Sequence, residues 1–345
     1  MQNSFYPAQS FGYSETFFLE LGGRFDGLHV AYHTFGNLHP DKDNVVWICH
    51  ALTADSDVSG WWKGMVGPGT LYDPSEYFIV CANYLGSCYG TTGPLTINPT
   101  TGKPWYREFP DITVRDMVRV HELLRQHLGI GHIHTVIGGS IGGFQSMEWA
   151  IANPGLFTHA VLIACNEKST PWTIALNESQ RLSILADRTF FDDIPEGGAA
   201  GLKAARSVAL LSYRNGVAYN KTQGEEAIEK TGDFRASSYQ RYQGDKLTRR
   251  FNAYSYFSIT KTMDTHNVAR GRGNTAGALK RIKARTLVVG ITTDILFPVN
   301  EQQQMATAIP GAQYREIQSD FGHDGFLVEP AALTEVILNF YKKKK

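Results

Sequence analysis

Residues Thr135–Ala150 read TVIGGSIGGFQSMEWA and place one serine, Ser140, between two pairs of glycines. The apolar run before Ser140 has the character of a buried strand, and the residues after it are typical of a helix. Gly138, Ser140 and Gly142 fit the pattern GxSxG, which in this context forms a sharp elbow that exposes the serine. Glycine is needed there because side chains at the flanking positions would block the close approach of neighbouring backbones. The motif therefore predicts a nucleophilic serine.

Other apolar runs resemble the one that precedes Ser140. They begin at Val45, Tyr77, His159 and Thr286, and each is short and almost continuously apolar. Continuous apolar character, without alternation, is typical of parallel strands that are covered on both faces. We therefore expect these runs to form a mostly parallel sheet.

A helix is predicted between the second and third of these five runs. Its apolar residues recur at helical spacing, Thr113 and Asp116 match an N-terminal capping box, and Gly129 stands where the helix would end. An alternation of strand and helix is the signature of a doubly wound α/β sheet. The fold class is therefore α/β.

The alternation stops after Cys165. Residues 166–280 are mostly helical in pattern, with polar and aromatic side chains and glycine breaks, and the strand pattern resumes at Thr286. We expect residues 1–165 and 281–345 to form the α/β core, and residues 166–280 to form a helical lid inserted over the carboxyl edge of the sheet. A chain of 345 residues is long enough for this arrangement.

Composition restricts the class of protein. Lys plus Arg equals Asp plus Glu at 33 each, so the overall charge gives no indication of a nucleic-acid or anionic-membrane partner. The N-terminal stretch has neither a basic region nor a long apolar run, so we expect no signal peptide, and no run is long enough to span a bilayer. The four cysteines have no metal-type spacing and are expected to be reduced. A cytoplasmic protein is predicted.

A serine nucleophile needs a base, and the base needs an acid to orient it. The order associated with this elbow is serine, acid, histidine. Of the eleven histidines, only His266 and His323 lie well after Ser140 and beyond the strands next to it. His323 is in a glycine-containing loop near the C-terminus and is the expected base, whereas His266 falls in the predicted lid and is expected to be an ordinary polar residue.

Asp294 is the expected acid because it directly follows the buried run that begins at Thr286. It therefore stands at the carboxyl end of a strand, where its side chain can reach the crevice. Asp320 is the rival, but it shares the loop of His323 and is expected to be a turn residue. Ser140, Asp294 and His323 thus form a predicted catalytic triad.

Two backbone N–H groups are expected to form an oxyanion hole. One belongs to Ile141, directly after the nucleophile, and the other to Leu52, in the loop after the run that begins at Val45. His132 and His134 form an HxH pair, but no Cys or carboxylate cluster accompanies them, so no metal site is predicted. Nucleotide-phosphate loops of the GxGxxG and GxxxxGK[ST] types are absent.

Several separated stretches resemble the homoserine O-acetyltransferase family of the α/β-hydrolase superfamily. The similarity extends over nearly the whole chain and is more specific than GxSxG alone. The stretches include CHALTADSDVSGWW (49–62), GPGTLYDPSEYFIVCANYLGSCYGTTGP (67–94), FPDITVRDMV (109–118), GGSIGGFQSMEWA (138–150), IALNESQR, NAYSYFSITKTMD, VGITTDILFP and GHDGFLVE.

The resemblance implies a ping-pong reaction with acetyl-CoA as co-substrate and no bound cofactor. Ser140 would take the acetyl group from the thioester, and the hydroxyl of L-homoserine would then accept it, giving O-acetyl-L-homoserine for methionine biosynthesis. His323 would serve as base in both steps, with Asp294 holding its ring. A homodimer formed through the helical lid is also implied.

An amino-acid acceptor needs a cation for its carboxylate and an anion for its ammonium group. Asp324, next to His323, is well placed for the ammonium group. Arg206 and Tyr213 are seven residues apart on a predicted helix, so both can face one cleft. The resemblance implies that they bind the carboxylate, and Arg181 is a weaker candidate. The alternatives without a binding role are that Asp324 is a turn residue and that Arg206 is a solvated arginine of the lid.

Three departures from the common family pattern concern the acyl pocket. Ile141 and Phe144 stand where methionine is common, and Tyr89 follows Cys88 where lysine is frequent. Three readings therefore stay open at this point. They are a homoserine O-acetyltransferase, a transferase of the same mechanism with another donor or acceptor (homoserine O-succinyltransferase or serine O-acyltransferase), and a plain esterase.

Overall fold

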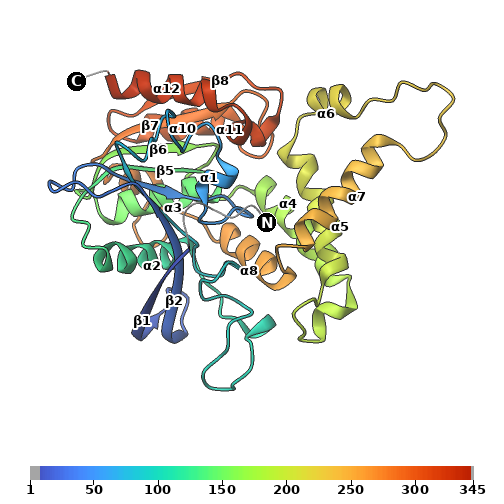
Figure 1. Cartoon of the computed structure of the whole chain (residues 1–345), viewed down its shortest axis with the longest axis horizontal. Coiled ribbons are helices and arrows are strands. Elements are labelled where there is room, and N and C mark those ends of the chain that lie inside the picture. The colour runs from blue at the N-terminus through green and yellow to red at the C-terminus, as the bar shows by residue number, and fades with distance from the viewer. Residues whose placement is uncertain (1–7, 343–345) are drawn as a thin grey trace.

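An eight-stranded sheet forms the centre of the protein in the computed structural model, which describes residues 8–342 (Figure 1). The strand order is β1-β2-β4-β3-β5-β6-β7-β8; the pairs β1/β2 and β2/β4 are antiparallel and all others are parallel. The strands are β1 Gln9–Phe18, β2 Arg24–Phe35, β3 Val45–Cys49, β4 Phe78–Ala82, β5 Ile133–Gly139, β6 Phe157–Ile163, β7 Arg285–Ile291 and β8 Gln313–Ile317. The expected mostly parallel α/β sheet is confirmed.

The five strands predicted from apolar runs are β3 to β7, and all five are confirmed. Strands β1, β2 and β8 were not predicted. Their sequences lack a continuous apolar run. Strands β1 and β8 are the two edges of the sheet, and β8 has only one buried residue, Ile317, whereas buried and exposed residues largely alternate in β2. The expected absence of a signal peptide rests partly on residues 1–7, which lie outside the described residues.

The sheet is covered on both faces, so alternate residues of a strand enter different cores. In β3, Val45 and Trp47 belong to one apolar cluster, whereas Val46 and Ile48 belong to the other. The first cluster includes residues of α2 (Val114–His127), α3 (Ile141–Ala152) and α10 (Val299–Ala308). The second includes residues of α1 (Val58–Trp61), α11 (Gly325–Val328) and α12 (Pro330–Lys342).

Helix α2 begins and ends where the sequence predicted. The side chain of Thr113 accepts a hydrogen bond from the Asp116 N–H, and the Asp116 carboxylate accepts one from the Thr113 N–H at 2.8 Å. Gly129, just after the helix, has a φ of 64°, a conformation that favours glycine. The capping box and the glycine stop are therefore confirmed.

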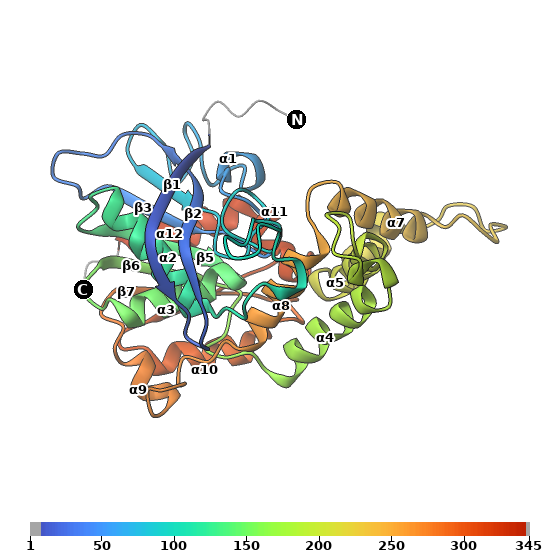
Figure 2. The same cartoon turned by 90° about the horizontal axis from the view of Figure 1, so that it is seen from below.

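Helices follow one another between β6 and β7, as predicted. Figure 2 shows α4, α5 and α7 beside the sheet and its covering helices, with α8 between these two parts. These helices are α4 Pro171–Leu185, α5 Ala199–Tyr213, α6 Gly216–Gln223, α7 Arg235–Thr248, α8 Ala253–Asp264 and α9 Thr275–Leu279. The division into core and lid at residues 165 and 281 stays a prediction. Within residues 8–342, no helix combines the length and the apolar character needed to cross a membrane.

Candidate active site

Ser140 occupies the turn between β5 and α3 and has an unusual backbone conformation, with φ 59° and ψ −129°. A Cβ atom at Gly138 would lie 2.3 Å from the backbone of Gly142, and one at Gly142 would lie 2.0 Å from the carbonyl oxygen of Cys49. Both distances are far below van der Waals contact. The predicted steric need for glycine around the serine is thus confirmed.

His323 and Asp294 meet although 29 residues separate them. The Nδ1 atom of His323 lies 2.8 Å from Oδ2 of Asp294. The other carboxylate oxygen, Oδ1, accepts hydrogen bonds from the N–H groups of Leu296 at 2.8 Å and Phe297 at 3.0 Å. Because backbone donors hold one oxygen, the other is fixed in its orientation toward the imidazole.

Aromatic rings surround the imidazole of His323. The ring centroids of Phe297, Phe326 and Tyr213 lie 5.3, 5.4 and 5.7 Å from it. The side chain is only 4% exposed. Packing and the Asp294 contact together leave Nε2 as the nitrogen available for chemistry.

Asp320 and His266, the other candidates for the acid and the base, do not form this contact. Asp320 is exposed, and Asp294 is the carboxylate beside His323. His266 is buried, and its Nε2 lies 3.2 Å from the carbonyl oxygen of Asn166. Its ring stacks on that of Phe144 at 4.0 Å. Burial lowers the pKa of His266 to about 3, so it is a neutral core residue at ordinary pH.

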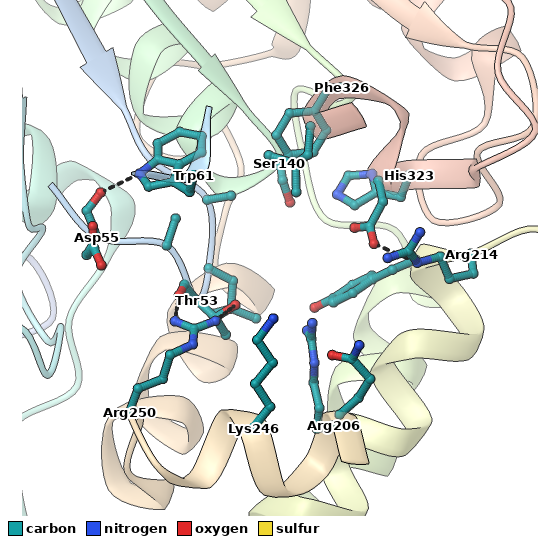
Figure 3. Close-up of a pocket in the computed structure, with 17 residues that line it drawn as sticks. Thr53, Asp55, Trp61, Ser140, Arg206, Arg214, Lys246, Arg250, His323 and Phe326 are labelled. Atoms are coloured by element: carbon teal, nitrogen blue, oxygen red, sulfur yellow. Dashed lines mark hydrogen bonds and ion pairs between the residues drawn. The ribbon is translucent and has the colours of Figure 1, made fainter. Parts of the chain in front are cut away.

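Ser140 and His323 line the same cavity, which has a volume of about 380 Å³ (Figure 3). One wall comes from the loop after β3, and the opposite wall comes from α5 and α7, which precede and follow α6 in the chain. The lining residues are Ala51, Leu52, Thr53, Ala54, Asp55, Trp61, Ser140, Arg206, Tyr213, Arg214, Gln243, Lys246, Arg250, His323, Asp324, Phe326 and Leu327.

Charged side chains on the helical wall face the serine across this cavity. The guanidinium of Arg206 lies over the ring of Tyr213, with 5.6 Å between its Cζ and the ring centroid. Its Nε is buried and has no hydrogen-bond partner among the described residues. An unpaired buried donor is costly, so a ligand that accepts from Arg206 would be stabilised here.

Asp324 is paired with a residue that the sequence did not single out. Its Oδ2 lies 2.9 Å from Nε of Arg214, which ends helix α5. Burial raises the pKa of Asp324, and the positive charges of Arg214 and Arg206 oppose that rise. The only signal in the sequence was the position of Arg214 directly after Tyr213, on the helix that carries Arg206.

Tyr84 holds the loop after β3 in place. The hydroxyl of Tyr84 donates to the carbonyl oxygen of Leu52 at 2.6 Å, and the ring of Tyr84 stacks on His50 at 4.4 Å. On the other side of the serine, Ile141 is the first residue of α3, where backbone N–H groups have no partner within the helix. Both predicted oxyanion donors therefore belong to segments next to Ser140.

The side chains of four residues that the sequence linked to the acyl pocket or to the substrate do not line the cavity. Ile141 and Phe144 are completely buried, and Tyr89 reaches the cavity only through Arg250, whose Nη1 lies 2.5 Å from the Tyr89 hydroxyl. Arg181 is buried and donates to Glu178 and Asp264, so its charge is already balanced. The amino-acid carboxylate is therefore not expected at Arg181.

Metal ligands do not gather at this site. Across residues 8–342, no group of three or more His, Cys, Asp or Glu side chains is placed to hold a metal ion. Cys49, Cys81 and Cys165 are buried free thiols, and burial raises the pKa of Cys49 to about 12. The arrangement supports acyl transfer through a serine, with proton transfer by the histidine.

The chain is similar to known proteins over most of its length. Residues 44–330 match the family model described as "alpha/beta hydrolase fold". The homoserine O-acetyltransferase of Cyclobacterium marinum is 46% identical over 327 residues, covering 95% of this chain and 93% of the relative. That of Trichormus variabilis is 43% identical over 332 residues, covering 94% and 91%.

Solved structures with different activities share the fold. The homoserine O-acetyltransferase from Bacillus anthracis superposes with a TM-score of 0.91 at 24% identity, covering 99% of both chains. The acetyl esterase MekB gives a TM-score of 0.86 at 21% identity, covering 98% of this chain and 97% of that one. At such identities the likeness shows the fold alone, and the fold does not decide which group accepts the acyl chain.

Proposed function

The chain belongs to the homoserine O-acetyltransferase family of α/β hydrolases, and from this premise we propose that it transfers an acetyl group from acetyl-CoA to the hydroxyl of L-homoserine. The observation that carries the proposal is the charged wall opposite Ser140. Arg206 and Asp324 offer a cation and an anion in one cavity with the serine, which suits a zwitterionic amino acid. A water molecule, the acceptor in an esterase, needs neither charge.

The first half-reaction acylates Ser140. His323 Nε2 takes the hydroxyl proton as Oγ attacks the thioester carbonyl, and Asp294 stabilises the imidazolium through the 2.8 Å contact with Nδ1. The N–H groups of Leu52 and Ile141 donate to the oxyanion that forms. The intermediate collapses, His323 gives the proton to the thiolate, and coenzyme A leaves. Ser140 then carries the acetyl group.

The second half-reaction reverses the roles. The hydroxyl of homoserine attacks the acetyl-serine carbonyl while His323 takes its proton, and the proton then returns to Ser140 as O-acetyl-L-homoserine is released. Arg206 and Tyr213 hold the carboxylate of the amino acid. Asp324 receives the ammonium group and keeps Arg214 as its second partner.

The same proposal covers the assembly and the place of action. Apolar side chains are exposed on the helices between β6 and β7, among them Trp172, Leu182, Leu211 and Val217. A homodimer formed through these helices would cover them. Sedimentation of the full chain tests this point, and a monomer at micromolar concentration would contradict it. We place the enzyme in the cytoplasm, in methionine biosynthesis.

A four-way assay tests the activity. Acetyl-CoA or succinyl-CoA is supplied with L-homoserine or L-serine, thiol release is followed, and the products are identified by mass spectrometry. Acetyl-CoA with homoserine is expected to give the highest kcat/KM and one O-acetylhomoserine for each thiol. Thiol release that is independent of the amino acid, with acetate as product, would make the protein an esterase. A preference for succinyl-CoA would contradict acetyl-CoA as the donor, and a preference for serine would contradict homoserine as the acceptor.

A further inference from the structure

The loop of residues 50–57 makes few hydrogen bonds within itself. Within it, Ala54 N–H donates to the Ala51 carbonyl oxygen at 3.1 Å, His50 Nδ1 lies 2.9 Å from the same oxygen, and Asp57 N–H donates to Asp55 Oδ1 at 3.0 Å. Other carbonyls of the loop accept from side chains outside it. Leu52 accepts from Tyr84, as described above, and Asp55 accepts from Trp61 Nε1 at 2.8 Å. The shape of the loop, and with it the position of the Leu52 N–H, therefore depends on outside partners.

Arg250 is another outside partner of this loop. It follows α7 in the chain, 197 residues after Thr53, yet its Nη1 donates to the carbonyl oxygen of Thr53. The same nitrogen lies 2.5 Å from the hydroxyl of Tyr89, and Nη2 lies 3.5 Å from the Thr53 hydroxyl. Figure 3 shows the guanidinium of Arg250 beside Thr53, at the edge of the cavity that holds Ser140.

The backbone of Arg250 is anchored as well. Its N–H donates to the carbonyl oxygen of Leu247 at 2.9 Å, and its own carbonyl oxygen lies 3.7 Å from the thiol of Cys88. The Tyr89 ring packs edge-on against Phe251 at 5.7 Å. With its backbone bonded to Leu247 and its guanidinium bonded to both Thr53 and the Tyr89 hydroxyl, the Arg250 side chain is held against the loop in one orientation.

We propose that Arg250 is a positioning residue for acyl transfer: by holding the Thr53 carbonyl, it fixes the adjoining Leu52 so that the Leu52 N–H meets the oxyanion. Tyr84 holds the carbonyl of Leu52, and Arg250 holds the next carbonyl along the chain. The inference rests on the proposed function, because it takes Leu52 as an oxyanion donor. It adds that the segment after α7 helps to build the oxyanion hole.

The consequence is kinetic. An oxyanion donor acts on the charge that develops in the transition state, and a displacement of about 1 Å can cost about 100-fold in rate. Loss of Arg250 is therefore expected to lower kcat far more than it raises KM. The effect is expected with every acyl donor, because the oxyanion forms whatever the leaving group is.

The matched control is Lys246. It lies four positions before Arg250, lines the same cavity and carries the same charge, yet within residues 8–342 no loop carbonyl accepts a hydrogen bond from it. Arg250→Met and Lys246→Met remove the same charge from the cavity. Only Arg250→Met also removes the bond to Thr53.

The experiment measures both variants of the full chain with two donors, acetyl-CoA and p-nitrophenyl acetate, which carries no phosphate. Arg250→Met is expected to lower kcat by about 10- to 100-fold with both donors, and Lys246→Met by less than threefold with p-nitrophenyl acetate. Arg250→Lys, which keeps a donor for Thr53, is expected to recover part of the loss. Tyr89→Phe, which removes one partner of Arg250, is expected to cost a few fold in kcat.

Two results would overturn the inference. One is an Arg250→Met enzyme that keeps its kcat with p-nitrophenyl acetate and shows only a raised KM for acetyl-CoA, since Arg250 would then act on the phosphates of the donor. The other is equal loss in the two methionine variants. If Arg250→Met fails to fold, Arg250→Lys and Tyr89→Phe test the inference instead. Unchanged kcat in both variants would exclude Arg250 as a positioning residue. The wild-type four-way assay judges the proposed function separately.

Discussion

The Oδ2 atom of Asp324 lies 2.9 Å from Nε of Arg214, so the residue that follows His323 is tied to the end of helix α5. A side chain from the segment after β8 and one from the end of α5 thus line the cavity together. In the proposed reaction the amino acid would enter next to this ion pair.

Asp324→Asn removes the anion proposed for the ammonium group. We expect the KM for homoserine to rise by about tenfold or more, because a hydrogen bond to a charged group contributes about 1.5–3 kcal/mol. Acylation by p-nitrophenyl acetate should change much less. Asp320→Asn is the matched control, since Asp320 is an exposed aspartate of the same segment. Equal effects of the two substitutions on homoserine would remove Asp324 from the binding site.

Arg206→Met removes the cation proposed for the carboxylate. The homoserine half-reaction is expected to slow by about 10- to 100-fold, because the substrate carboxylate loses a charge-assisted partner. Single-turnover transfer from preformed acetyl-enzyme to homoserine measures this step, and the burst of p-nitrophenol measures acylation. Arg249→Met, at an exposed arginine that does not line the cavity, is the control. Equal damage to both half-reactions would count against carboxylate binding.

Ser140→Ala removes the nucleophile. Turnover is expected to fall by about 10⁴-fold or more, because neither half-reaction can proceed without an acyl-enzyme. The variant should keep the melting temperature of the wild type within a few degrees, and mass spectrometry should find no acetylated protein after incubation with acetyl-CoA. Activity within tenfold of the wild type would exclude Ser140 from its role.

Gly142→Ala tests the elbow itself. The added Cβ would lie 2.0 Å from the carbonyl oxygen of Cys49, a backbone atom that has no room to yield. We expect a loss of folded protein or a large drop in melting temperature. Gly155→Ala is the control, because no heavy atom lies within 4 Å of its added Cβ. A Gly142→Ala protein as stable and as active as the control would contradict the steric account.

Buried histidines predict a dependence of stability on pH. The pKa of His266 is about 3 in the folded protein and its ordinary value is 6.5, so between these values the unfolded chain binds a proton that the folded chain does not. The free energy of unfolding should therefore fall as the pH drops below 6.5, by about 1.4 kcal/mol per pH unit for each such histidine. Burial lowers the pKa of His50 to about 3 and that of His121 to about 4, so they act in the same direction.

His266→Gln tests this assignment. Urea unfolding at pH 7.5 and pH 5.0 should show a smaller loss of stability for the variant than for the wild type, because one titrating group is gone. An identical pH dependence in the two proteins would show that His266 does not titrate in this window.

The sequence alone was sufficient for features that depend on neighbours along the chain. The glycines around Ser140, the capping box at Thr113 and the five apolar strands are local sterics, local hydrogen bonds and local periodicity, and each was predicted at its observed place. Strands β1, β2 and β8 were missed because half-exposed strands lack the continuous apolar run that marks β3 to β7.

Only the tertiary structure decided which distant side chains share the cavity. The contacts between His323 and Asp294, between Asp324 and Arg214, and between Arg250 and Thr53 join segments that are far apart in the sequence. The topology of the α/β hydrolase indicated the first contact, but no periodic pattern indicates the other two. These contacts arise because the sheet brings the loops after β3 and β7 to one edge, and the helices between β6 and β7 fold back over that edge. Burial and charge pairing then select partners that local sequence cannot specify.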